Sequence, residues 1–472
     1  MVIVQGGVGP GELGVLVAFR QGFYDCLDRR GDALFELTDA VVSRPGRVDS
    51  VPALSLEPEF RRGHGALYGA LSNGRVDVPR LRALLLNTVG PGRGPVLWFA
   101  GDVSNIARPD AVTSPERRAV HDKSARTISG KPVTSGYPWA VMAALEPGPT
   151  SWTGPVDAAR LRPDDTLTQV TLDTMTRIIA GLTAAGRAGE RGPEIPGFVF
   201  DSEYDLMALS HELGATTHIL GRLRSNQTFH AAPDRTPGPR GRGAPARHGT
   251  KITLNDPATL HTPDRTAVTT TARYGHVTLS AWDGQHRRIT RAGYWTEHPG
   301  RTPIVTGTVL RIQIGHLPGG GTPDRPMWLW HTGPTLLDLI TLFATYQRRF
   351  DLEHTFRFLK QDLGWTVFTP MLPATAEVWT WLVLAAYTQL RLTRQISQDL
   401  RMRWEKPQAP DRITPRRVRR DIRRLHHHTG TPANPPQNTR PGPGRPPGTT
   451  KPPRERHPTH IKNPKKPEKT KK

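Results

Sequence analysis

Three carboxylates in this 472-residue sequence stand where they could hold divalent metal ions. Asp102 follows the apolar run Val96–Ala100, and Asp201 directly follows the apolar run Gly197–Phe200. Each run is typical of a buried strand, and neighbouring strands would bring both carboxylates to the same end of one sheet. An aspartate after a strand is more commonly a turn former or a helix cap. The pair therefore gains weight from a third carboxylate, Glu353, in a segment with a helical pattern.

Such carboxylates suit phosphodiester chemistry. Hydrolysis needs an activated water and stabilised charge on the attacking and leaving oxygens, which two metal ions about 3.5–4 Å apart supply together. Hard oxygen ligands suit Mg²⁺ or Mn²⁺, which favours carboxylates over His or Cys.

The segment around Glu353 carries regularly spaced polar residues. At about 100° per residue, Arg349, Glu353 and Lys360 fall within roughly 60° of Tyr346 on one helix face, and Arg357 joins that face. The opposite side is an apolar stripe that could pack on a sheet, made of Leu352, Phe356, Leu359 and Leu363. A plain amphipathic helix, with Glu353 stabilised by nearby cations, is the alternative interpretation.

The spacing Tyr-x2-Arg-x3-Glu-x6-Lys of Tyr346, Arg349, Glu353 and Lys360 resembles the YREK signature of DDE-type bacterial insertion-sequence transposases, the group named after insertion sequence four. The resemblance spans roughly residues 90–400. It implies a ribonuclease-H-like fold, two catalytic Mg²⁺ ions for which Mn²⁺ substitutes, and double-stranded DNA with terminal inverted repeats as substrate. It also implies a homodimer in the DNA complex.

The resemblance also implies a role for each residue. Asp102 and Asp201 would bridge or flank the metal ions, and Glu353 would complete the second metal site. DNA phosphates would be contacted by four side chains of the signature helix: Tyr346, Arg349, Arg357 and Lys360.

Rival carboxylates stay open at two positions. Asp110 competes with Asp102. After Asp201 the chain reads Ser-Glu-Tyr-Asp, where the family usually has a glycine, so Glu203 and Asp205 compete with Asp201.

The charge of the chain favours nucleic acid as a partner. The net charge is +22, and residues 401–472 hold 21 Lys and Arg against 5 Asp and Glu, a net of +16. The apolar stretch 378–387 is too short to cross a bilayer and reads as a buried helix, so no membrane is expected. Cys26 is the only cysteine, which excludes an intramolecular disulfide. No signal peptide is indicated, and we expect a cytoplasmic, nucleoid-associated bacterial protein.

Hydrophobic periodicity predicts an α/β protein with a ribonuclease-H-like mixed sheet flanked by helices. In residues 91–221 the expected order is β-β-β-α-β-α-β, with strands at 96–100, 138–145, 151–156, 197–200 and 217–220 and helices at 167–185 and 206–213. The other expected regions are an N-terminal helical, possibly DNA-binding domain (1–90), a β-rich insertion (222–325), the second part of the core with the signature helix (326–400) and a basic Pro-rich tail (401–472), largely disordered from about residue 429.

Weaker signals concern further DNA contacts. Arg222 and Arg224 follow the last core strand and could touch the DNA backbone, although exposed arginines are usually solvated. Arg445 lies in PGPGRPPG, which resembles the minor-groove core of an AT-hook; binding of phosphates without sequence preference is the safer expectation for the tail. Trp328 and Trp330 are more readily explained as core residues than as base-stacking ones.

These observations favour a cut-and-paste DNA transposase. The alternatives are a non-catalytic DNA-binding protein derived from a transposase and a structure-selective nuclease with the same core.

Overall fold

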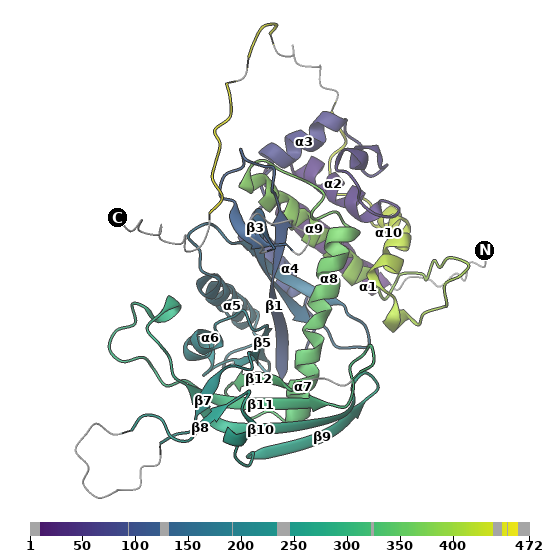
Figure 1. Cartoon of the computed structure of the whole chain (residues 1–472). Helices are drawn as coiled ribbons and strands as arrows, with labels where there is room; N and C mark the ends of the chain where they lie inside the picture. The colour runs from purple at the N-terminus through teal and green to yellow at the C-terminus, as the bar shows by residue number, and fades with distance from the viewer. Residues whose placement is uncertain are drawn as a thin grey trace, which may run out of the picture. The chain divides into compact units, whose positions relative to one another are not determined.

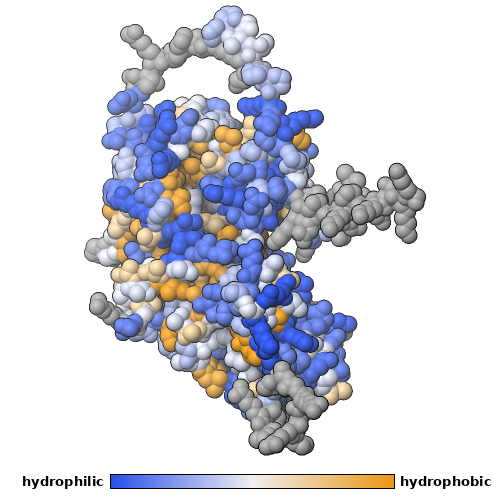
Figure 2. Space-filling model, turned by 90° about the vertical axis from the view of Figure 1, so that its left-hand side faces the viewer, coloured by the Kyte–Doolittle hydropathy of each residue, from blue (hydrophilic) through white to orange (hydrophobic). Residues whose placement is uncertain are grey.

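The computed structural model describes residues 10–92, 94–122, 132–190, 192–233, 246–321, 325–437, 446–450 and 452–460. The chain forms two compact units. The first unit consists of Met1–Gly90, Val103–Asp165 and Asp351–Lys472, and the second of Pro91–Asp102 and Thr166–Phe350. No helix in the described ranges is long and apolar enough to span a membrane. Most of the face drawn in Figure 2 is hydrophilic, with smaller apolar patches between.

Helices dominate the first unit (Figure 1). They are α1 (Pro10–Tyr24), α2 (Gly31–Ser43), α3 (His64–Asn73), α4 (Val78–Asn87), most of α8 (Phe350–Gln361), α9 (Pro373–Thr393) and α10 (Pro415–Thr429), with short 3-10 turns at Pro52–Leu56 and Pro410–Arg412. α9 is buried along nearly its whole length because α1, α2, α3, α4 and α10 all pack against it. The predicted burial of residues 378–387 is therefore confirmed.

α10 is a helix that the sequence analysis left within the tail. Val418, Ile422 and Leu425 recur at helical spacing and are fully buried, although arginines surround them in the sequence. Each such apolar side chain contributes about 1.5–3 kcal/mol when it leaves water. Three buried anchors are enough to fix this basic helix against α9 and α2.

Described residues beyond α10 form hydrogen bonds with the rest of the first unit. Arg61 donates a hydrogen bond to the carbonyl of Ala433 at 2.9 Å, and Arg117 donates to the carbonyl of His457 at 2.8 Å. The backbone N–H of Ala119 donates to the carbonyl of His460. Two arginine side chains and one backbone N–H therefore hold two stretches of the tail on the first unit.

The first unit also contains the edge of a mixed sheet. Its strands are β2 (Arg118–His121), β3 (Val133–Leu145), β4 (Thr153–Arg160) and the second half of β1 (Val96–Ala107). β3 pairs antiparallel with both β2 and β4, and β1 is its neighbour in the strand order. β3 and β4 match the strands expected at 138–145 and 151–156, whereas β2 was not predicted.

The second unit is built around the rest of this sheet, which within the described residues has twelve strands. From the first half of β1 the order runs β1-β5-β6-β12-β11-β10-β7-β8, and β9 pairs with β10. The bounds are β5 (Ile195–Phe200), β6 (His218–Leu223), β7 (Thr228–His230), β8 (Lys251–Thr253), β9 (Arg265–Thr271), β10 (Gly275–Arg287), β11 (Thr306–Ile314) and β12 (Met327–Thr332). β1, β5 and β6 are parallel, and β12, β11 and β10 are antiparallel to their neighbours.

Helices flank the sheet of the second unit: α5 (Leu167–Ala184), α6 (Leu206–Leu213) and α7 (Leu339–Arg348). α6 connects the parallel strands β5 and β6, and α5 precedes β5 in the chain; both helices lie beside β5 in Figure 1. A Cβ at Gly221 would come within 2.4–2.7 Å of the Leu206 side chain, so the glycine lets α6 lie directly on β6. The parallel and antiparallel strands, with these helices beside them, form the mixed, helix-flanked sheet of a ribonuclease-H-like fold, as predicted.

A buried histidine pair joins β6 to β12 in the second unit. Nδ1 of His218 lies 3.1 Å from Nε2 of His331, and the rings stack. Burial lowers the pKa of His218 to about 4, from the usual 6.5, and burial likewise lowers the pKa of His331. Both rings are therefore neutral in the folded protein at neutral pH.

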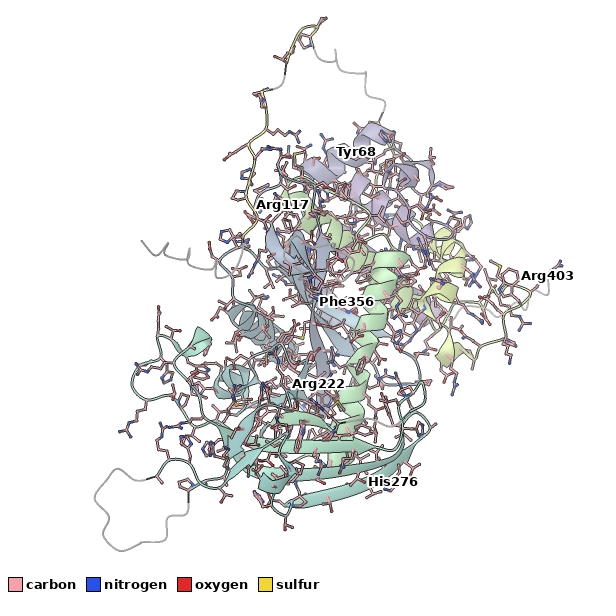
Figure 3. The ribbon with its side chains drawn as sticks, in the orientation of Figure 1. Tyr68, Arg117, Arg222, His276, Phe356 and Arg403 are labelled. Atoms are coloured by element: carbon pink, nitrogen blue, oxygen red, sulfur yellow. The ribbon has the colours of Figure 1, made fainter. Side chains whose placement is uncertain are left out.

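This pair predicts acid sensitivity. Below about pH 6.5 these two histidines bind protons in the unfolded chain, whereas their buried rings in the folded protein stay neutral. Their contribution to the free energy of unfolding is therefore fully present above that pH. It is lost as the pH falls towards their pKa values in the folded state. Each such histidine adds up to about 1.4 kcal/mol per pH unit to the change of the free energy of unfolding with pH. Urea unfolding measures the free energy of unfolding at pH 7.5 and at pH 5.0. His331→Asn should make the difference between these two free energies smaller than in the parent. His276→Asn, at an exposed position on β10 (Figure 3), should leave this difference unchanged. The same difference in both variants and the parent would show that the buried histidine pair is not the cause of the acid sensitivity.

Candidate active site

Asp102 and Asp201 occupy matching positions on neighbouring parallel strands. The register pairs Ala100 of β1 with Val199 of β5, and each aspartate stands two residues beyond its member of that pair. Because β1 continues to Ala107, Asp102 lies inside the strand and not just past its end, which corrects the predicted boundary. The predicted meeting of the two carboxylates at one region of the sheet nevertheless holds.

The guanidinium of Arg349 lies between the two carboxylates. Nη1 is 3.4 Å from Oδ2 of Asp102, and Nη2 is 3.9 Å from Oδ2 of Asp201. The Arg349 side chain is only 3% exposed and also lies over the ring of Phe350, whereas the two aspartates keep a quarter to a third of their side-chain surface exposed. Solvent therefore reaches the carboxylates from one side while a buried cation holds them from the other.

Two buried tyrosines flank this group. Burial raises the pKa of Tyr204 well above its usual value, and the negative charges of Asp102 and Asp201 raise it further. Burial also raises the pKa of Tyr346, against the opposing charge of Arg349. Tyr346 is 1% exposed, so its phenol is a neutral part of the wall. Tyr346 and Arg349 were predicted to contact DNA phosphates, and that role stays a prediction for side chains that the folded protein buries.

The chemistry of the two aspartates fits a hard divalent cation. They are oxygen donors on adjacent strands and already share one positive group, the Arg349 guanidinium. Among the described residues, no group of three or more His, Cys, Asp or Glu side chains could hold a metal ion.

Glu353 lies in the first turn of α8, four residues beyond Arg349, and is exposed. The helix is interrupted at Arg349, where α7 ends, so the predicted single helix is two helices in succession. Within the first unit, Thr355 of α8 hydrogen-bonds Thr153 of β4 at 2.8 Å. The apolar stripe from Leu352 to Leu363 is buried as predicted.

The rival carboxylates have other surroundings. Asp205 caps α6 by accepting a hydrogen bond from the backbone N–H of Ala208, the common role of an aspartate before a helix. Glu203 is exposed, and Asp110 is exposed in the turn that follows β1. Arg349 forms ion pairs with Asp102 and Asp201.

A cavity of about 360 Å³ in the second unit is lined by Glu203, Tyr204 and Asp205, which follow Asp201 in the chain. Arg222, which Figure 3 labels on β6, and Arg224 line it, and both are exposed as a DNA contact requires. Arg287 and Arg288 at the end of β10 also line it and were missed by the sequence analysis. Their signal was an Arg-Arg pair directly after an alternating strand pattern, which becomes informative only when β10 is known to reach the cavity.

The remaining predicted contacts lie elsewhere. In the first unit Arg357 is exposed on α8, and Nζ of Lys360 donates a hydrogen bond to the carbonyl of Asn105 at 3.4 Å. Arg445 falls outside the described residues. Trp328 and Trp330 are buried, which confirms their interpretation as core residues.

Comparison with known proteins identifies the family of the chain. Residues 22–288, more than half of the chain, match the family model described as DDE superfamily endonuclease. The matched segment contains Asp102 and Asp201 and ends before Glu353. No curated protein matches the chain. The chain belongs to the DDE superfamily endonucleases.

Proposed function

We propose that this endonuclease is a cut-and-paste DNA transposase that cleaves terminal inverted repeats and joins the freed 3′ ends to target DNA. One observation carries the proposal: Asp102 and Asp201, on neighbouring parallel strands, converge on a single positive group. Such a pair is suited to holding divalent metal next to a phosphodiester.

Glu353 is the proposed third carboxylate. At a rise of about 1.5 Å per helical residue, it follows Arg349 by roughly one turn, and Arg349 touches both aspartates. Glu353 is exposed on the side of α8 that lies opposite the apolar stripe. The spacing Tyr346, Arg349, Glu353, Lys360 supports membership of the YREK group.

The proposed reaction has two steps with the same geometry. Water attacks the scissile phosphorus and the 3′ oxygen leaves as a hydroxyl; that hydroxyl then attacks a phosphorus of the target strand, displacing its 3′ oxygen. Mg²⁺ or Mn²⁺ bound by Asp102, Asp201 and Glu353 would supply charge stabilisation and an activated nucleophile. Arg349 orients the two aspartates, because its planar guanidinium can face both at once.

DNA would be held by cations around this region. Arg222 and Arg224 on their cavity, with Arg357 and Lys360 on α8, are the proposed backbone contacts, and the basic tail with Arg445 would add contacts without sequence preference. A homodimer on paired ends, in the bacterial cytoplasm, completes the proposal.

A joining assay tests this function. Purified protein is incubated with Mg²⁺, a labelled duplex that carries the inverted repeats bordering the gene, and a supercoiled target plasmid. The expected result is cleavage at the repeat ends followed by labelled plasmid, with no product when EDTA replaces Mg²⁺. Cleavage of branched or flapped DNA without joining would instead indicate a structure-selective nuclease. DNA binding without any cleavage would indicate a non-catalytic derivative.

A further inference from the structure

The loop between α9 and α10 exposes large apolar side chains at its tip. Trp404 is 82% exposed, and Met402 and Leu400 are each nearly half exposed. They alternate with Arg401 and Arg403, the latter labelled in Figure 3. Water contact with an indole is costly, so a nearly bare tryptophan at a loop tip points to an interaction surface.

The ends of this tip loop, residues 400–405, are tied down within the first unit. Arg420 of α10 forms an ion pair with Glu405 and donates a hydrogen bond to the carbonyl of Leu400 at 3.2 Å. The backbone N–H of Met402 donates to Glu405 at 2.8 Å. Just outside the loop, Arg417 donates to both oxygens of Asp399 at 2.9 Å. The tip is therefore presented in a fixed form, and less conformational entropy is lost when a partner binds.

The charge around the tip selects a polyanion. The acidic groups at its ends, Asp399 and Glu405, are neutralised by α10, which leaves Arg401, Arg403 and Lys406 as the excess charge. An exposed apolar wedge between arginines is the combination by which proteins unstack a DNA base step while they hold its flanking phosphates.

The anchor of the loop borders a cavity of about 580 Å³ that is also lined by α8. Glu405 and Arg420 stand on this cavity, as does Arg357, which lies one helical turn beyond Glu353. Trp152 and Phe358 form apolar parts of its wall. A DNA strand held at the tip loop would thus run beside the helix that carries the proposed third carboxylate.

We propose that the tip loop is a DNA wedge: Trp404, backed by Met402, inserts at a base step of the duplex while Arg401 and Arg403 contact the phosphates on either side. This inference rests on the proposed function only in taking DNA as the partner. The proposed contact between the tip loop and DNA does not depend on Asp102, Asp201 or Glu353.

The test measures duplex binding by the full-length protein in EDTA, where no cleavage occurs. The probe is a 40-base-pair duplex that carries 2-aminopurine, whose fluorescence rises when it is unstacked. Trp404→Ala should weaken binding by about fivefold or more and abolish the fluorescence rise, and Trp404→Phe should retain most of both. The matched control is Leu56→Ala, which removes another bare apolar side chain of the same unit, 84% exposed, and should change neither.

The arginines give an independent readout. Arg401→Gln with Arg403→Gln should lower the slope of log affinity against log salt by roughly two, whereas Trp404→Ala should leave the slope unchanged. Unchanged affinity and fluorescence in Trp404→Ala, with cleavage intact in the parent protein, would overturn the wedge and leave the proposed function standing. A change in sedimentation of Trp404→Ala without DNA, at parental DNA affinity, would also overturn it, because the surface would then bind a second copy. Failure of the parent to bind duplex DNA at all would overturn both proposals.

Discussion

Replacing Asp102 or Asp201 by asparagine is expected to lower the rate of DNA cleavage by about 10³-fold or more. An amide has nearly the same shape as a carboxylate but lacks its charge, so it is a poor ligand for a divalent ion. Loss of bound metal removes several kcal/mol of transition-state stabilisation, and each 1.4 kcal/mol changes the rate tenfold. The fold should survive, because Arg349 keeps its ion pair with the other aspartate in each variant. Single-turnover cleavage of an end-labelled duplex is the measurement.

The rival carboxylates supply matched controls in the same assay. Glu203→Gln and Asp110→Asn remove exposed acidic groups at short distances along the chain from Asp201 and Asp102. Asp110→Asn should cleave within about twofold of the parent, since surface substitutions away from a site have small effects. Glu203 lines the cavity that Arg222 and Arg224 also line, so Glu203→Gln is the stricter control, and it should still cleave far faster than Asp201→Asn. Glu353→Gln should behave like Asp201→Asn. If Glu203→Gln lost the activity and Asp201→Asn kept it, the assignment on β5 would be wrong.

Replacing Arg20 by methionine is expected to lower the free energy of unfolding by about 3–5 kcal/mol. Arg20 is 2% exposed in α1 and forms a two-pronged ion pair with Asp39 of α2, at 2.7 and 2.8 Å. It also donates to Gln389 of α9 at 2.7 Å and to the carbonyl of Gly430 after α10 at 2.9 Å. Its removal leaves a buried carboxylate without its cation, which is strongly destabilising. Equilibrium unfolding in urea measures the loss.

Two variants separate this effect from a general loss of charge. Arg80→Met breaks an exposed ion pair with Asp25 and should cost less than about 1 kcal/mol. The double variant Arg20→Met, Asp39→Leu removes both charges and should be more stable than Arg20→Met alone, because no unpaired carboxylate is left. Equal stability of the single and double variants would show that packing, and not the buried charge, dominates.

The sequence predicted the elements whose own residues determine them. The apolar runs 96–100 and 197–200 are buried strands because their side chains can be satisfied only inside a sheet, and the stripe from Leu352 to Leu363 is buried by the same logic. The common position of Asp102 and Asp201 followed from the strands alone, since neighbouring parallel strands align their ends.

Features that depend on distant partners could not be predicted. β1 extends past Asp102 to Ala107 because β3 is its neighbour there, whereas Gly-Asp-Val-Ser-Asn alone reads as a turn. A helical projection places Tyr346 and Arg349 on one face but cannot tell that this face is covered. In α10, the abundance of arginine hid the three apolar residues that fix it.

Metal location in a complex with DNA tests the central claim most directly. The parent protein is crystallised with an uncleavable DNA end and Mn²⁺, and the manganese ions are located from their anomalous scattering. We expect manganese to be bound by carboxylate oxygens of Asp102, Asp201 and Glu353 at about 2.0–2.2 Å, next to the scissile phosphate. Manganese bound away from the two aspartates, or an ordered complex in which Glu353 stays remote from them, would contradict it.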